Sequence, residues 1–246
     1  MRLHKRIYNK IDLILIKNRF ESDLKKFINN NNQRFEIDKK RFLPNYLDAT
    51  ENTDFDGHYV YHPAWALRIL KKNNPKLHID IGSTLSFSSM ASAYHIVEFY
   101  DFRPANLNLD NLTSNFADLI SLPFESNSIS SLSCMHTVEH VGLGRYGDMI
   151  DYDGDLKAIE ELKRVVIPNG NLLFVVPIGG VAKIIFNSHR IYNYQQVINL
   201  FENFELMNFA LITDNNEYNP ESSKIDADSQ DYGCGCFWFV KKMIHD

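Results

Sequence analysis

The stretch SLSCMHTVEHVGLGRYGD, residues 131–148, joins a short apolar run to a polar turn punctuated by glycines. The run that ends at Cys134 is predicted to be a buried strand, and His136, Glu139 and His140 follow at spacings that share one helical face. Titratable side chains directly after a strand are typical of a site at the carboxyl end of a sheet. The stretch therefore predicts a central strand and a site beside it.

Composition limits what this site can belong to. The chain has 246 residues, 44% of them hydrophobic and 13% aromatic, which suffices for one large core with a small appendage. A net charge of −5 argues against a protein that grips nucleic acid by its phosphates. No apolar run reaches the roughly 18 residues that a membrane span needs, and residues 1–6 lead into no cleavable signal. We expect a cytoplasmic protein.

The three cysteines are Cys134, in the predicted strand, and Cys234 and Cys236, which one glycine separates. Two cysteines that alternate along a strand make a poor disulfide and an incomplete metal site. We expect all three to be reduced packing residues.

The elements fall into two parts. Residues 1–57 are predicted to be a helical and irregular appendage, because apolar residues recur near helical spacing between residues 5 and 27 (Ile7, Ile11, Leu15, Phe20, Leu24 and Phe27). Residues 58–246 alternate between helices and strands, which predicts an α/β fold with a doubly wound, mainly parallel sheet. The predicted strands are 77–81, 96–100, 129–134, 171–177, 209–213 and 236–241. The first predicted helix begins after Pro63 and is ended by Pro75, and a second follows the strand 77–81 and runs through Ala93. Two further helices are predicted at 156–166, before a stop at 168–170, and at 195–201.

Polar residues follow three successive apolar runs. Gly82 and Ser83 come after Asp80, where a glycine lets a ligand approach the backbone. Asp101 ends the second strand, where a carboxylate can accept both hydroxyls of a ribose. Asp118 could accept from an adenine amino group, with Leu119 against the ring. Taken singly, each also suits an ordinary capped turn.

In this order, Asp80, Asp101 and Asp118 resemble the class I S-adenosylmethionine-dependent methyltransferases. The resemblance spans about residues 76–178 and includes LPFESNSI (122–129), VEHV (138–141), ELKRVVIPNG (161–170) and LLFVVP (172–177). It implies a seven-stranded Rossmann-like sheet and S-adenosylmethionine as cofactor, bound by Asp80, Gly82, Ser83, Asp101, Phe102, Asp118 and Leu119. One departure is that Thr84 and Ser86 stand where the family has its later glycines.

Four further segments resemble a little-characterised methyltransferase-like family whose bacterial members accompany surface-polysaccharide (capsule) genes: HYVY (58–61), YDFRP (100–104), GLGRYGD (142–148) and FNSHRIY (186–192). This resemblance implies O-methylation of a sugar hydroxyl, for example of a heptose, on a small-molecule or oligosaccharide acceptor in polysaccharide biosynthesis. The departure at Thr84 and Ser86 leaves open a non-catalytic binding or scaffold protein of the same fold. A homodimer is one option for the oligomeric state.

A sugar hydroxyl must be activated before it attacks a methyl group, and a histidine can take its proton. The candidates are His136, His140 and His189. Alternatively, these histidines with Glu139 bind a metal, because they are similar to the Glu-x-x-Glu-His plus distant His set of small-RNA 2′-O-methyltransferases. With imidazole replacing a carboxylate, Mn, Fe, Co or Zn is favoured over Mg. The same residues also suit a plain hydrogen-bonded cap.

The polar loop that follows this cluster supplies candidates for acceptor recognition. Arg145, Tyr146 and Asp148 lie in the loop, and Arg190 could meet a phosphate on a nucleotide-linked sugar. Methylation of RNA is a third hypothesis, which the acidic balance of the chain opposes, so we expect no nucleic-acid partner.

Overall fold

The computed structural model describes residues 10–29, 34–38 and 40–243. The chain divides into two compact units, Met1–Asp54 and Phe55–Asp246. The part of the predicted first helix that holds Ile7 lies outside the described residues, as do residues 30–33 of the polar tract behind it.

The first unit contains one long helix among its described residues, α1 (Lys10–Asn29). Leu13, Ile14, Leu15 and Phe27 of this helix are exposed. Its Phe20 packs edge-on against Tyr46 from the irregular segment that follows, at 5.3 Å between ring centroids. The predicted N-terminal helix is therefore present.

The second unit is built on an eight-stranded sheet with the order β3-β2-β1-β4-β5-β10-β8-β9. The strands are β1 (Leu77–Ile81), β2 (Ile96–Asp101), β3 (Leu112–Phe116), β4 (Ile129–Met135), β5 (Val166–Ile178), β8 (Phe204–Ile212), β9 (Tyr218–Asn219) and β10 (Gly233–Lys241). A separate hairpin is formed by β6 (Lys183–Ile185) and β7 (His189–Ile191). The sheet has eight strands where seven were predicted, and the two-residue β9 lies at one edge.

Strand direction sets where the site lies. The five strands from β3 to β5 are parallel, whereas β10 is antiparallel to both of its neighbours, β5 and β8. The carboxyl ends of β1, β2 and β4 therefore meet at one edge of the sheet, and β10 begins at that same edge. The α/β fold with a mainly parallel sheet is as predicted.

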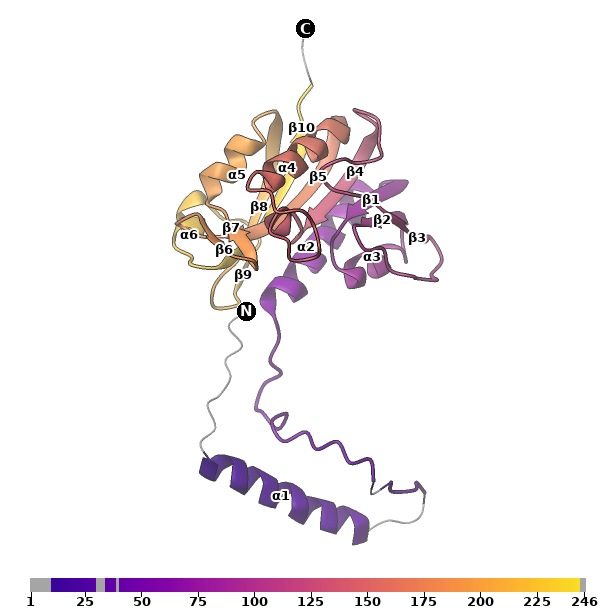
Figure 1. Ribbon diagram of the computed structural model, residues 1–246, viewed down its shortest axis with the longest axis vertical. Coiled ribbons are helices and arrows are strands. Elements are labelled where there is room, and N and C mark those ends of the chain that lie inside the picture. Colours follow the sequence, from indigo (N-terminus) through magenta and orange to yellow (C-terminus); the bar gives the residue numbers. More distant parts are fainter. Residues whose placement is uncertain (1–9, 30–33, 39, 244–246) are drawn as a thin grey trace. The chain divides into compact units, whose positions relative to one another are not determined.

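Helices cover both faces of the sheet, and Figure 1 shows α4 over the central strands and α5 towards β8. On one face, α4 (Gly154–Val165), α5 (Tyr194–Leu200) and α6 (Lys224–Asp228) pack residues such as Leu162 and Val197 into the larger core. On the other face, α2 (Gly57–Asn73) and α3 (Leu85–Ala91) contribute Trp65 and Phe87 to a second core. Among the described residues, no helix is long and apolar enough to cross a membrane.

Two predicted boundaries were wrong. Helix α2 begins at Gly57 rather than after Pro63, because the Asp56 side chain accepts a hydrogen bond from the His58 backbone N–H and caps the helix. Residues 168–170 do not separate a helix from a strand, since the chain passes from α4 directly into β5 at Val166. An irregularity in the pairing of β4 with β5 accommodates this early start.

The expectation that His136 shares a helical face with Glu139 and His140 was also wrong. Only Val138–His140 is helical, as a single 3₁₀ turn called η1. His136 precedes it with φ of +55°, in the left-handed region, and its backbone N–H donates to the Val175 carbonyl of β5. The turn nevertheless brings the His136 and Glu139 side chains together.

Candidate active site at the carboxyl ends of the parallel strands

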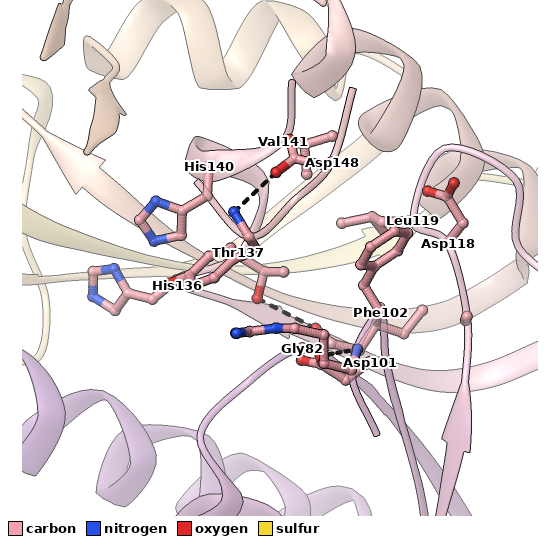
Figure 2. A pocket seen from close by; sticks show the side chains of 14 residues that line it. Gly82, Asp101, Phe102, Asp118, Leu119, His136, Thr137, His140, Val141 and Asp148 are labelled. Carbon is pink, nitrogen blue, oxygen red and sulfur yellow. Dashed lines mark hydrogen bonds between the residues drawn. The ribbon is translucent and has the colours of Figure 1, made fainter. Parts of the chain in front are cut away.

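A cavity of about 200 Å³, partly open to solvent, lies at the carboxyl ends of β1, β2 and β4. Figure 2 shows the rings of His136 and His140 at one end of this pocket and Phe102, Leu119 and Asp118 at the other. The lining residues are Ile81, Gly82, Asp101, Phe102, Arg103, Ala117, Asp118, Leu119, His136, Thr137, His140, Val141, Tyr146 and Asp148.

Gly82 makes the turn at the end of β1. Its φ is +67°, and a Cβ there would lie 2.9 Å from Thr137 Oγ1, too close for a side chain to be added without a shift. The Gly82 N–H donates to the Tyr100 carbonyl, which ties this turn to β2. Gly82 lines the pocket, so this turn forms part of its wall.

The wall beside Gly82 combines carboxylates with apolar side chains. Asp101 ends β2, and its Oδ1 accepts from the Arg103 backbone N–H at 2.7 Å. Asp118 Oδ1 accepts from the Ile120 N–H at 3.1 Å. Phe102 and Leu119 lie on the same wall. The structure therefore brings together Gly82, Asp101, Phe102, Asp118 and Leu119 of the residues predicted to bind the cofactor.

Asp80 and Ser83, the other two predicted cofactor ligands, are buried and do not line the pocket. Asp80 Oδ1 accepts from Ser133 Oγ at 2.6 Å, and its Oδ2 accepts from the Ser88 hydroxyl. Burial raises the pKa of Asp80 to about 6, against the hydrogen bonds that lower it. Asp80 thus ties β1 to β4 and α3.

The two positions that depart from the glycine-rich pattern have local explanations. Thr84 has φ of −69° and is the N-cap of α3, where its side chain accepts from the Phe87 N–H. Ser86 lies exposed inside α3. Neither backbone conformation requires glycine, because the left-handed turn is confined to Gly82.

His140 presents a free nitrogen at the polar end of the pocket. Its Nδ1 lies 2.6 Å from the Ser188 carbonyl oxygen, which can only accept, and 3.2 Å from the Arg145 guanidinium, which can only donate. The shorter contact places the proton on Nδ1 and leaves the lone pair on Nε2. Burial lowers the pKa of His140, although Glu139 raises it. A neutral imidazole with its lone pair on Nε2 can act as a general base.

His136 is held by Glu139, which is buried behind the pocket lining. The distance from His136 Nδ1 to Glu139 Oε1 is 2.9 Å, and the carboxylate fixes the proton on Nδ1. Glu139 Oε1 also lies 3.7 Å from His140 Nε2. One carboxylate therefore contacts both histidines.

The predicted acceptor-binding residues divide into two groups. Tyr146 and Asp148 line the pocket, and the Arg103 guanidinium stacks over the Tyr146 ring at 4.4 Å. Asp148 also orders the loop, because its Oδ2 accepts from Gly142 N–H at 2.8 Å and from Gly144 N–H at 3.2 Å.

Three other predicted site residues lie off the pocket lining. Arg145 donates to the Ser188 carbonyl at 2.9 Å. Arg190 is buried, pairs with Asp155 at 3.3 Å and donates to the Val141 carbonyl at 2.6 Å. His189 packs its ring against Tyr232 at 4.9 Å between centroids. Arg190 is thus engaged in holding the loop to α4.

Sequence reasoning missed part of the site. Thr137, Val141 and Ala117 line the pocket, and each is next in the sequence to a residue that was predicted to belong to the site. Their position close to the ends of strands could have identified them. Sequence reasoning also missed His58 and Cys234. Among the residues that the structure describes, the donor atoms of His58, His136 and Cys234 all lie within 4.8 Å of one another. The metal set expected from the sequence, His136, Glu139, His140 and His189, stays a prediction.

Residues 94–233 match the family described as "Caenorhabditis protein of unknown function, DUF268". No curated protein shows significant similarity to the chain.

Several solved structures with a similar fold are methyltransferases. One is the 1,6-didemethyltoxoflavin-N1-methyltransferase of Burkholderia thailandensis, solved with 1,6-didemethyltoxoflavin and S-adenosylhomocysteine (TM-score 0.52, 11% identity, 75% of this chain and 81% of that chain covered). Another is the N-methyltransferase NodS of Bradyrhizobium japonicum WM9 (TM-score 0.50, 12% identity, 74% and 94% covered). At these identities the likeness shows a Rossmann-like methyltransferase fold.

Proposed function

Because the chain belongs to the DUF268 family, for which no activity is described, we propose its function from the site: an S-adenosylmethionine-dependent O-methyltransferase that acts on a sugar hydroxyl. The observation that carries this proposal is one pocket with a glycine turn and carboxylates at one end and a neutral histidine at the other. The toxoflavin methyltransferase of similar fold was solved with S-adenosylhomocysteine, which supports the cofactor.

The pocket wall fits the cofactor in its chemistry. Gly82 lets the backbone approach the amino-acid end, Asp101 can accept the ribose hydroxyls, and Phe102 with Leu119 offers apolar surface to the adenine. Asp118 can accept from the adenine amino group. The bound cofactor would supply an electrophilic methyl group, and the protein must position an acceptor in line with it and exclude water.

Activation of the acceptor falls to His140 in this proposal. Its Nε2 lone pair can take the hydroxyl proton while Nδ1 stays bonded to the Ser188 carbonyl. Glu139 stabilises the imidazolium that forms, because its Oε1 lies 3.7 Å from Nε2. Tyr146 and Arg103, stacked together on the lining, partly shield this end of the pocket from water.

We propose a sugar hydroxyl as the acceptor, for example that of a heptose in surface-polysaccharide biosynthesis. The support is the resemblance of residues 142–148 and 186–192 to the polysaccharide-associated family. The exposed Tyr146 ring beside Asp148 and His140 adds a flat apolar face next to hydrogen-bonding groups, which suits a polyhydroxylated ring.

Two measurements test the proposal in turn. Calorimetry should detect binding of S-adenosylhomocysteine to the purified chain, and transfer of a labelled methyl group should follow with nucleotide-sugars or capsule oligosaccharides as acceptors. Absence of cofactor binding would overturn the whole proposal, including its enzymatic class. Binding together with methylation of a non-sugar acceptor would overturn only the acceptor assignment.

A further inference from the structure

Three potential metal ligands converge next to the pocket from elements far apart in the sequence. His58 lies in the first turn of α2, His136 follows β4, and Cys234 is the second residue of β10. Their donor atoms all lie within 4.8 Å of one another, and all three residues are buried. Two of the three residues lie on a helix and a strand, which hold ligands more rigidly than loops do.

The spacing and the orientation of this cluster suit a metal ion. Cys234 Sγ lies 3.3 Å from His136 Nε2. Tetrahedral Zn–S and Zn–N bonds of about 2.3 and 2.0 Å place such a pair of ligands about 3.5 Å apart. Glu139 holds the proton on His136 Nδ1, so the Nε2 lone pair faces Cys234. A carboxylate behind a ligating histidine is the usual support of a bound metal.

The charge of the surroundings also favours a cation. Glu139 is only 1% exposed, its Oε2 has no hydrogen-bond partner, and in the described part of the chain its salt-bridge contacts are the imidazoles of His136 and His140. A buried carboxylate without a cationic partner is unfavourable. A divalent ion beside Glu139 would supply the missing cationic partner.

We propose that His58, His136 and Cys234 bind one divalent metal ion of borderline softness, best matched by Zn²⁺, with a fourth position left to water or another oxygen ligand. Two imidazoles and one thiolate suit Zn²⁺ and disfavour Mg²⁺ and Ca²⁺, which take oxygen ligands. On binding, the Cys234 thiol releases its proton to solvent and no redox change occurs.

The site adjoins the proposed methyl-transfer pocket but does not depend on it. His136 lines the pocket, whereas His58 and Cys234 do not, so the ion lies at the pocket wall. Metal binding can be tested independently of methyl transfer, because it is measured without cofactor or acceptor. The cluster also separates two roles, since His140 keeps its Nε2 free while His136 serves the metal.

The test is metal binding by the full reduced chain after removal of metal with a chelator. We expect one Zn²⁺ per chain by elemental analysis and titration calorimetry. Bound Co²⁺ should show a thiolate-to-metal charge-transfer absorption, which reports Cys234 directly. Cys234→Ser should abolish that absorption, and both Cys234→Ser and His58→Gln should weaken Zn²⁺ binding at least 100-fold. Glu139→Gln should weaken it about 10–100-fold, as expected for a residue that orients a ligand.

Matched controls are Cys134→Ser, a buried cysteine of β4 outside the cluster, and Cys236→Ser, whose Sγ lies 3.9 Å from Cys234 Sγ. Both should keep the Co²⁺ absorption and the Zn²⁺ affinity. Circular dichroism checks folding, and His58→Gln decides if Cys234→Ser does not fold.

No bound metal in the wild-type chain would overturn the proposal. Binding lost in His140→Gln or His189→Gln but kept in Cys234→Ser would also overturn it, in favour of the other set. Calorimetry with S-adenosylhomocysteine on the metal-free chain tests methyltransferase function separately.

Discussion

Two residues at the rim of the pocket have left-handed backbones, and they differ in what this conformation costs. Gly82 has φ of +67° without steric penalty, whereas His136 holds φ of +55° with a full side chain. A non-glycine residue in this region is strained by about 1–2 kcal/mol. The strain at His136 is retained where its ring contacts Glu139 and Cys234, as is typical of functional positions.

Gly82→Ala should weaken binding of S-adenosylhomocysteine by roughly tenfold or more. The added Cβ is strained by about 1–2 kcal/mol at positive φ and meets the Thr137 side chain on the pocket wall. Titration calorimetry measures the affinity. Gly147→Ala is the matched control, because Gly147 also has positive φ but no atom lies within 4 Å of a Cβ there. Equal affinities for wild type and Gly82→Ala would remove Gly82 from the cofactor wall.

His140→Gln should lower methyl-transfer turnover by about 10²–10⁴-fold, the usual contribution of a general base. Because burial lowers the pKa of His140 below 6.5, the wild-type enzyme should hold this base unprotonated at neutral pH. Its kcat/KM should therefore fall with acid only below about pH 6.5, the ordinary value for histidine. A series of assays across pH measures this limb, which should vanish in His140→Gln.

The control for this substitution is His95→Gln, which changes a buried histidine whose ring contacts the Pro75 carbonyl outside the pocket. Its turnover and acid limb should match those of wild type. Unchanged turnover in His140→Gln, with cofactor affinity intact, would assign the base elsewhere.

At the scale of single residues, members of the site could be predicted because they lie at or after the ends of strands. Asp101 ends β2 and His140 follows β4, and both strands were predicted from the sequence. Strand β3, which precedes Asp118, was not predicted, because most of its residues are polar. The partnership of His58 with Cys234 was not predictable, because these residues meet only through the packing of α2 and β10 near the same end of the sheet. Cys234 and Cys236 are buried and form no disulfide, as expected. Cys234 is more than a packing residue, however, because its Sγ contacts the ring of His136.

Among the elements, the start of α2 matters most for the site, because its first turn carries His58. Asp56 accepts from the His58 N–H at 3.1 Å, and the Gly57 N–H donates to Asn216 Oδ1 at 3.2 Å. The helix entrance is thereby fixed to the loop before β9. Pro63 lies inside the helix in its second turn, which is why proline was a misleading guide to the helix start.

Asp56→Ala should lower the free energy of unfolding by about 0.5–2 kcal/mol, the usual effect of losing an N-cap side chain. Asp56→Ser keeps a capping oxygen and should remain within about 0.5 kcal/mol of wild type. Urea denaturation followed by circular dichroism measures both. Equal stability of the alanine and serine variants would show that the cap does not contribute.

Elements with strong local patterns were predicted well. β1, β2 and β4 are apolar runs bounded by turn residues, and their structural bounds agree with prediction to within one residue. The β6–β7 hairpin was not predicted, since its strands have only three residues each. Strand β8 begins at Phe204, five residues earlier than predicted, because its first residues alternate between the core and the surface.

At the scale of the whole molecule, every strand of the sheet and every pocket residue belongs to the unit Phe55–Asp246. The sheet with helices on both faces supplies two continuous cores within this unit. Such a unit has what a domain requires for independent folding.

A fragment of residues 55–246 should therefore fold cooperatively and bind S-adenosylhomocysteine within about twofold of the full chain, as independent domains do. Thermal unfolding and calorimetry measure the two properties, with Gly82→Ala in the same fragment as the negative control for binding. A fragment that unfolds without a cooperative transition would show that residues 1–54 contribute to the fold.

The place of β10 between β5 and β8 has a consequence for the order in which a newly made chain can fold. β5 and β8 do not pair with each other; each pairs with β10, which follows all other strands in the sequence. During synthesis the edge of β5 stays open until residues 233–241 have left the ribosome, and an open edge is a template for wrong pairing. The last strand thus closes the sheet and brings Cys234 to the histidines in a single event.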